Sequence, residues 1–397
     1  MSAVLQRSAR GPKIAAKTRS ALILTVVHNP QDSRIRHRQI AALLAARWNV
    51  TYVAPFRGFG MSVPLLRPAR SGSGELKCVD IRRSSGRQRL QAWRDARRVV
   101  RRLASQHDVV LVHDPELILA VAGLRLPNLM WDVHEDPAAA LLVKKWMPRL
   151  LRRPAGAAWR IAERLIERRH DLLLAEHAYQ QRFRRSHPVV TNSVTVPLTT
   201  EPAGDDRVSY LGSVSMSRGC DTMIEVAQEL RRRTGGAVGV EVIGEAADPE
   251  TRRALQRAST EGDLIWHGFL PSDKALARIT GSMAGLCLLR DLPNFRESLP
   301  TKIVEYGALG VPVVTTPLPL AAQFVRQHSV GIEVPWDQAD AVVEALLKLR
   351  SDAQLRAELG ANGRAAVMRD HNWRHLSNEF VDIMNKFAEA KRRVESR

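Results

Sequence analysis

The apolar residues of the chain fall into short runs, and between the runs they recur every three or four positions. Short runs rich in Val, Leu and Ile predict buried strands, and the three- and four-residue spacing predicts helices. Strands that are apolar on both sides and alternate with helices indicate a parallel sheet covered on both faces. In the first half, the expected strands are residues 21–27, 49–54, 76–81, 108–113, 128–134 and 171–175.

The same pattern restarts after residues 191–206, a stretch whose Pro, Gly, Thr and Asp content is typical of a linker. The second set of expected strands is 208–214, 239–245, 263–269, 284–289, 311–316 and 330–334. Two Rossmann-like domains in tandem follow from this, with ligands in the cleft at the carboxyl ends of the strands. The expected division is a basic flexible tail at 1–20, domains at 21–197 and 198–370, and a terminal helix at 371–397.

The terminal helix is predicted from apolar residues at three- and four-residue steps. They are Trp373, Leu376, Phe380, Ile383 and Phe387.

Composition places the chain among soluble globular proteins. It has 397 residues, 45% apolar and 25% charged, which is ordinary for such chains and long enough for two domains. No segment reaches the roughly 18 apolar residues that cross a bilayer, and residues 21–27 suit a first strand better than a secretory signal. We therefore expect a cytoplasmic protein, with any membrane contact peripheral and at the inner face of the plasma membrane. The three cysteines are scattered without metal-ligand spacing, so reduced thiols are expected.

Two glutamates flank the start of a helix in "NFRESLPTKIVEYGALGVPVVTT". Ser298 and Pro300 are expected as its cap and first turn, with the helix running from about Leu299 to Leu309. Glu297 then precedes the helix and Glu305 lies about 9 Å along it, at about 1.5 Å per residue. The free N–H groups between them suit a phosphate. This layout matches a nucleotide sugar, with sugar, diphosphate and ribose in sequence; two solvated flanking charges are the alternative.

A glycine turn between a strand and a helix lies at residues 210–230. Arg218 and Gly219 open the helix, so a fixed cation stands beside a helix amino terminus, where it can neutralise phosphate without a metal. A simple helix start is the alternative.

Two expected strands of the first domain each end in a histidine followed by an acid. His113 and His134 are therefore expected at the cleft edge of the sheet. They can be combined with Asp132 or Asp136 as a metal site, but no third and fourth ligand with suitable spacing appears. No metal is expected.

The segment around the two glutamates resembles the retaining glycosyltransferases of family 4, in which an E-x7-E pair precedes a G-x-P-V-V strand. Here the pair is Glu297 and Glu305, followed by "GVPVVTT". The resemblance implies a GT-B fold, with Glu297 facing the transferred sugar and Glu305 binding the nucleotide ribose. It also implies Lys302 at the diphosphate and His134 at the sugar and donor phosphate. Glu297, His134, Arg218 and Lys302 are thereby the expected reaction-centre residues.

The resemblance adds a set of donor-binding residues. They are Gly212, Ser213, Arg218, Gly219, Ser298, Leu299, Lys302 and Glu305. The chain departs from the family in two loops. Ser213 stands where the first basic residue of a G-R-x5-K-G-like loop usually lies, and the first turn has Asp32-x-Arg34 in place of Gly-Gly. Arg34, Arg36 and Arg38 either belong to that site or are solvated.

The expected function is therefore transfer of a sugar from a nucleotide diphosphate sugar to an acceptor hydroxyl, with retention, without metal and without a cofactor other than the donor substrate. A lipid-linked, lipid or polysaccharide acceptor of an envelope glycan is expected. The alternatives are a nucleotide-sugar 2-epimerase and a non-catalytic protein that uses the fold to bind a polyanion or a membrane.

The net charge of +19 lies wholly in the first half. Residues 1–200 carry 35 Lys and Arg against 14 Asp and Glu, and residues 201–397 carry 25 against 27. Residues 82–103 and 144–169 concentrate the arginines, with Trp93, Trp146 and Trp159 among them. Basic amphipathic helices with Trp favour an anionic membrane surface; arginines that are merely solvated are the alternative. Nucleic acid is not expected, because no recognised binding module is present.

Overall fold

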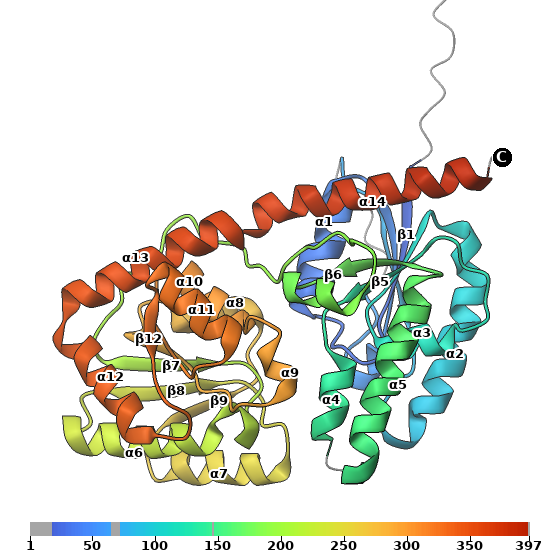
Figure 1. Cartoon of the computed structure of the whole chain (residues 1–397). Coiled ribbons are helices and arrows are strands. Elements are labelled where there is room, and N and C mark those ends of the chain that lie inside the picture. The colour runs from blue at the N-terminus through green and yellow to red at the C-terminus, as the bar shows by residue number, and fades with distance from the viewer. Residues whose placement is uncertain (1–17, 65–71, 145–146, 396–397) are drawn as a thin grey trace, which may run out of the picture.

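The computed structural model describes residues 18–64, 72–144 and 147–395 and contains two α/β domains, each built on a six-stranded parallel sheet (Figure 1). All twelve expected strands form, so the predicted tandem arrangement is confirmed. The expected tail, apart from its last residues, and Trp146 lie outside the described residues.

The first sheet has the order β3-β2-β1-β4-β5-β6. Its strands are β1 (Ser20–Leu24), β2 (Asn49–Ala54), β3 (Leu76–Asp80), β4 (Val109–Val112), β5 (Leu129–Val133) and β6 (Asp171–Leu174). Its main helices are α1 (Ala41–Ala45), α2 (Arg89–Leu103), α3 (Pro115–Ala120), α4 (Pro137–Val143) and α5 (Arg149–Glu167). Nearly every residue of β1, β4 and β5 is buried, as a parallel sheet with helices on both faces requires.

The second sheet has the order β12-β11-β10-β7-β8-β9, which repeats the topology of the first. Its strands are β7 (Arg207–Leu211), β8 (Gly239–Ile243), β9 (Ile265–Gly268), β10 (Ala284–Cys287), β11 (Val313–Thr315) and β12 (Gly331–Glu333). Its helices are α6 (Cys220–Thr234), α7 (Pro249–Thr260), α8 (Ser272–Ile279), α9 (Pro293–Arg296), α10 (Thr301–Ala308), α11 (Pro319–His328), α12 (Ala339–Ser351) and α13 (Ala353–Asp370). In both sheets the strand order reverses at the first strand, which is where ligands bind in such folds.

The terminal helix α14 (Trp373–Glu395) runs from the end of α13 back across the first domain (Figure 1). Trp373, Phe380 and Phe387 are buried in the same apolar cluster as first-domain residues of β1, β2 and β4. The chain therefore crosses between the domains twice. The two crossings are bonded to each other, because the N–H of Val194 donates to the carbonyl of His371 at 2.9 Å.

No helix within the described ranges is long and apolar enough to cross a bilayer.

Replacing Phe380 with alanine tests the contribution of this crossover. The ring is fully buried, so Phe380→Ala should lower the free energy of unfolding of the first domain by roughly 3–5 kcal/mol. Urea unfolding followed by tryptophan fluorescence measures this. The exposed neighbour Glu379 serves as the control, and Glu379→Ala should leave the midpoint nearly unchanged. Equal midpoints for the two variants would contradict a structural role for the helix in the first domain.

Candidate functional site

A cavity of about 630 Å³ lies between the two domains, at the carboxyl ends of both sets of strands. Eight of the ten residues proposed from the sequence line it. They are His134, Gly212, Ser213, Arg218, Ser298, Leu299, Lys302 and Glu305. The other two are sequence neighbours of lining residues: Gly219 follows Arg218, and Glu297 precedes Ser298. The fold therefore gathers residues that are up to 171 positions apart in the chain.

The helix at the centre of the site begins later than expected. α10 spans Thr301–Ala308, and its N-cap is Pro300, with no side-chain cap. The expectation that Ser298 caps the helix and that Leu299 starts it is wrong, because Pro300 has extended backbone geometry, with ψ of 121°. Glu297 precedes the helix, as expected, at the end of the short helix α9.

Lys302 places its ammonium group in the cavity wall beside the glycine turn. Its Nζ lies 3.4 Å from the centre of the Tyr210 ring and is buried without a hydrogen-bond partner among the described residues. A Cβ added to Gly212 would lie 3.9 Å from that Nζ. Burial lowers the pKa of Lys302 to about 7. A bound anion would strongly stabilise the charged form of this unpaired ammonium.

Glu305 lies one turn further along α10 on the cavity side. Burial raises its pKa to about 7, and the charges of Arg38 and Lys302 oppose that rise. Arg38 belongs to the first domain, on the helix Ser33–Ile40 that follows the first turn (the first-turn helix), and is buried. Its charge acts on Glu305. Of the two alternatives for this arginine, solvation is thereby excluded.

The glycine turn after β7 holds a single arginine close to the cavity. Nη1 of Arg218 donates to the carbonyl of Ser213 at 3.2 Å. Gly219 has a φ of +80°, and a Cβ there would lie 2.3 Å from the carbonyl oxygen of Leu288. Only glycine fits this position. The turn therefore packs tightly against Leu288, directly after β10, and Arg218 lies next to this close contact.

Glu297 faces the first domain. Its pKa is raised by burial and by the carboxylate of Asp136, while Arg160 and Arg182 oppose the rise. Oε2 of Glu297 is buried and has no hydrogen-bond partner in the described parts of the chain. Asp136 caps α4, accepting from the N–H of Ala139 at 3.0 Å. A carboxylate from each domain thus meets at this end of the cavity.

His134 lines the cavity from the end of β5. Its Nδ1 lies 3.1 Å from the carbonyl oxygen of Asp132, and its Nε2 lies 3.0 Å from Nε2 of His28. Burial and the nearby charge of His28 lower its pKa to about 4. His134 is therefore uncharged near neutral pH.

Asp132, behind His134, anchors the first-turn helix. Arg34 donates to both its carboxylate oxygens at 2.9 and 2.8 Å, and Gln39 adds a bond at 2.8 Å. The alternative that Arg34 is merely solvated is therefore excluded. Ligand atoms of His113, Asp132 and His134 lie within 4.8 Å of one another, but Arg34 already neutralises the carboxylate. A cation there would stand beside a buried guanidinium, so the donor set fits an ion-pair network better than a metal.

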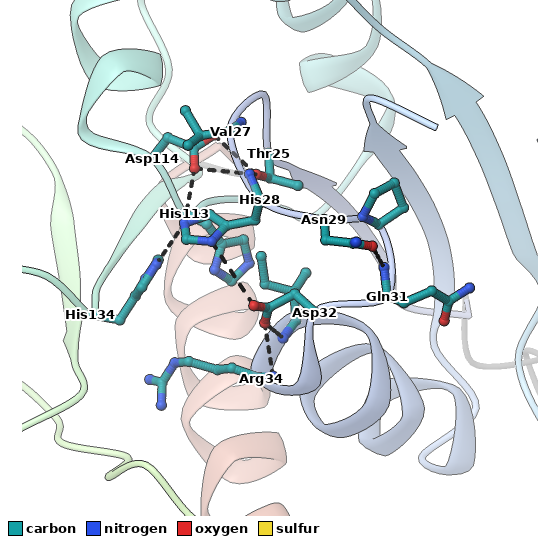
Figure 2. A network of polar contacts seen from close by, with 12 residues as sticks. Thr25, Val27, His28, Asn29, Gln31, Asp32, Arg34, His113, Asp114 and His134 are labelled. Carbon is teal, nitrogen blue, oxygen red and sulfur yellow. Dashed lines mark hydrogen bonds and ion pairs between the residues drawn. The ribbon is translucent and has the colours of Figure 1, made fainter. Parts of the chain in front are cut away.

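His28 and Asp114 were not among the residues predicted from the sequence. Figure 2 places them beside His134, and the three residues follow β1, β4 and β5. The signal was present: β1 is followed closely by a histidine, as β4 and β5 are. Only the strand order β1-β4-β5 makes these ends neighbours.

Comparison with known proteins finds a family model that is similar to the second domain. Residues 199–366 match the family described as Glycosyl transferases group 1. The chain is 28% identical over 173 residues to a GDP-mannose-dependent alpha-(1-6)-phosphatidylinositol monomannoside mannosyltransferase of Mycobacterium tuberculosis, covering 42% of this chain and 44% of that protein. It is 26% identical over 248 residues to the alpha-D-kanosaminyltransferase of Streptomyces kanamyceticus, covering 59% and 60%. The match thus spans less than two thirds of either relative.

Solved structures resemble the whole chain in fold. Sucrose-phosphate synthase of Thermosynechococcus elongatus superposes with a TM-score of 0.72 at 15% identity, over 94% of this chain and 100% of that one. WaaG, a glycosyltransferase involved in lipopolysaccharide biosynthesis, superposes with a TM-score of 0.66 at 13% identity, over 92% and 99%. The expected GT-B architecture is confirmed by these likenesses and by the two sheets.

The buried ammonium of Lys302 predicts a pH-dependent stability. Its folded-state pKa of about 7 lies below the ordinary value of about 10.4, so the unfolded chain binds more protons between these limits. The free-energy cost of burying the charged ammonium lowers the stability fully below about pH 7, and this cost disappears as the pH rises through about 10. Lys302→Met should therefore raise the unfolding temperature most at pH 6, with a gain that shrinks toward pH 10. Thermal unfolding across this range measures it. Lys274→Met, at an exposed lysine, is the control. A rise in the unfolding temperature of Lys302→Met that did not depend on pH would contradict the lowered pKa of Lys302.

Proposed function

We propose that the protein is a retaining glycosyltransferase that uses a nucleotide diphosphate sugar, and the match of residues 199–366 to the family Glycosyl transferases group 1 supports this. The observation that carries the proposal is the unpartnered ammonium of Lys302 in the cavity wall. In the chain Lys302 lies between Glu297 and Glu305, in the order that a sugar, a diphosphate and a ribose require.

Each part of the donor has a suitable group in the cavity. Lys302, Arg218 and the free N–H groups at the start of α10 face the expected diphosphate position, and fixed positive groups there stabilise the charge that develops as the sugar leaves. Glu305 is placed to accept hydrogen bonds from a ribose diol once it is ionised. Glu297 and His134 adjoin the expected sugar position. In this proposal, side chains and backbone provide the charge neutralisation, so no metal is required.

The proposed stereochemistry follows the family resemblance. The departing diphosphate oxygen takes the proton of the acceptor hydroxyl as that hydroxyl attacks from the same face, so that the carbon keeps its configuration. The relatives that match the chain are named as transferases. Neither the epimerase alternative nor the non-catalytic alternative receives support from them.

A thermal-shift screen against UDP-, GDP-, ADP- and dTDP-sugars tests donor binding, and product analysis with candidate acceptors tests transfer. One nucleotide sugar should raise the unfolding temperature of the wild-type protein, and Glu305→Ala should abolish that rise because the ribose loses its acceptor. Glu225→Ala, an exposed glutamate on α6, is the matched control. An unchanged rise in Glu305→Ala would remove Glu305 from the ribose role, and donor turnover without transfer to any acceptor would favour the epimerase.

We further propose that the first domain docks on an anionic membrane and takes a lipid-linked or lipid acceptor there. Helix α5 supports this through an exposed apolar stripe, with Leu150 90%, Ile161 59% and Leu165 53% exposed. The exposed arginines Arg153 and Arg164 flank the stripe. Such a face gains from both apolar burial and anionic headgroups.

Trp93 and Trp159 lie in a different setting from the one expected. The indole N–H of Trp93 donates to Glu116, and that of Trp159 to Glu163. Both rings are half-buried within the first domain, so the exposed leucines and isoleucine, rather than these rings, form the apolar part of the membrane face.

Vesicle sedimentation tests the docking surface. The wild-type protein should bind vesicles containing anionic lipid and bind neutral vesicles weakly, because charge and apolar burial act together. Ile161→Glu should reduce the binding roughly tenfold, since it places a carboxylate within the stripe. Phe269→Glu, at a similarly exposed side chain of the second domain, is the control. Equal binding to neutral and anionic vesicles, or none, would exclude the proposed membrane face.

A further inference from the structure

Three histidines follow three adjacent strands at the edge of the first sheet that faces the cavity. His28 follows β1, His113 follows β4 and His134 follows β5. Figure 2 shows His28 between Asp114 and His134, with contacts to both. His134 lines the cavity and His28 lies behind it. The loop that carries His28 is the first turn, in which the Gly-Gly of the family is absent.

The carboxylate of Asp114 is held in place by hydrogen bonds and in turn holds His28. The carboxylate is buried and accepts from the N–H of Val26 at 2.5 Å and from the hydroxyl of Thr25 at 3.1 Å. The same hydroxyl accepts from the N–H of His28 at 3.0 Å. Nε2 of His28 lies 3.2 Å from Oδ1 of Asp114. The backbone and the ring of His28 are therefore both held against the end of β4.

The hydrogen bonds of His134 fix the positions of its protons. A carbonyl oxygen only accepts, so the contact with the Asp132 carbonyl requires a hydrogen on Nδ1 of His134. In the neutral ring Nε2 then has no hydrogen and must accept. Its partner at 3.0 Å is Nε2 of His28, whose one N–H lies between Nε2 of His134 and Oδ1 of Asp114 at 3.2 Å and is shared by these two acceptors. Both nitrogens of His134 are thus engaged within the first domain.

The surrounding charges agree with this assignment. The carboxylates facing His28 are Asp114, Asp32, Glu135 and Asp132. Burial would lower the pKa of His28, but these carboxylates outweigh it and the pKa is raised. His134 is faced by Asp132 and Glu135, and by the rings of His28 and His113; burial and His28 lower its pKa to about 4. The two pKa shifts run in opposite directions, so His28 binds a proton more readily than His134 does, and His134 is the neutral ring of the pair.

We propose that His28 is a positioning residue for sugar transfer, which binds the bare Nε2 of His134 and thereby fixes that ring, uncharged and in one tautomer, in the cavity wall. Its consequence for transfer rests on the function proposed above. His28 itself does not contact the substrate. A fixed neutral ring offers the donor sugar a constant surface, and it has no spare N–H with which to protonate the departing diphosphate.

The histidine tautomers are measured directly by long-range ¹H–¹⁵N NMR of the full-length wild-type chain, with His134→Gln to assign the signals. The Nδ1–H tautomer of His134 should persist without titration from about pH 5.5 to 8, whereas an ordinary histidine titrates near about 6.5. An Nε2–H tautomer, or titration of His134 near that ordinary value, would overturn the proposal without reference to any activity.

Two substitutions at His28 separate positioning from simple packing. His28→Leu removes the donor, so kcat should fall roughly tenfold, with the KM for the donor changed less than about twofold. The titration of His134 should also move toward its ordinary range, because a neighbouring positive charge is lost. His28→Gln keeps an N–H near the Nε2 position and should retain kcat within about threefold.

His107→Gln is the matched control. His107 is also half-buried and bonded at both ring nitrogens, to Leu103 and Thr51, but it lies at the amino end of β4, away from the cavity. It should change neither kcat nor the titration of His134. Unchanged kcat and unchanged His134 titration in His28→Leu would refute the role of His28. If the wild-type protein transfers no sugar, the proposed function fails, while the NMR result still decides whether His28 holds His134.

Discussion

The meeting of two parallel sheets at one cavity is the constraint on which the other features depend. Each sheet presents its carboxyl ends, where loops leave the strands and side chains escape close packing. Opposing these edges requires that the chain cross between domains, and it does so twice, with Val194 and His371 bonded to each other at the crossing. Helix α14 then buries its apolar face in the first domain. The fold thus keeps a polar cavity between two well-packed bodies.

Charged groups in that cavity lack partners in the protein alone. The ammonium of Lys302 and one oxygen of Glu297 are buried without hydrogen bonds among the described residues, and burial shifts the pKa of Glu305 and of Lys302 toward neutrality. Such groups reduce the stability of the folded chain. A ligand that carries a diphosphate and hydroxyl groups would supply the missing partners, so the cost of burying these groups becomes selectivity for that ligand.

The first domain contributes to the site through ion pairs rather than through a glycine turn. Arg34 is held by Asp132, and this pair positions the helix that brings Arg38 toward Glu305. The same carboxylate accepts from Gln39 and lies near His113. A buried network of this kind tolerates little change, because removing one member leaves the others unpaired. At the first turn, where the resemblance implies Gly-Gly, this ion-pair network therefore holds the chain in place.

Much of the fold was available from the sequence. The twelve strands and the terminal helix were predicted from local patterns, since apolar runs and helix periodicity are properties of neighbouring residues. The segment around Glu297 and Glu305 was singled out by its spacing and by its resemblance to a known family. The errors were local too: Ser298 does not cap α10, because Pro300 already holds the backbone in an extended form immediately before the helix.

What the sequence by itself determined was the identity of the elements and the residue types carried by α10 and the segment before it. The tertiary structure alone decided which distant residues meet: Arg38 with Glu305, Asp136 with Glu297, and Asp114 with His28 and His134. The physical reason is that strand order and domain facing are set by packing between elements far apart in the chain. A histidine after each of β1, β4 and β5 becomes one cluster only when the sheet places those three strands side by side.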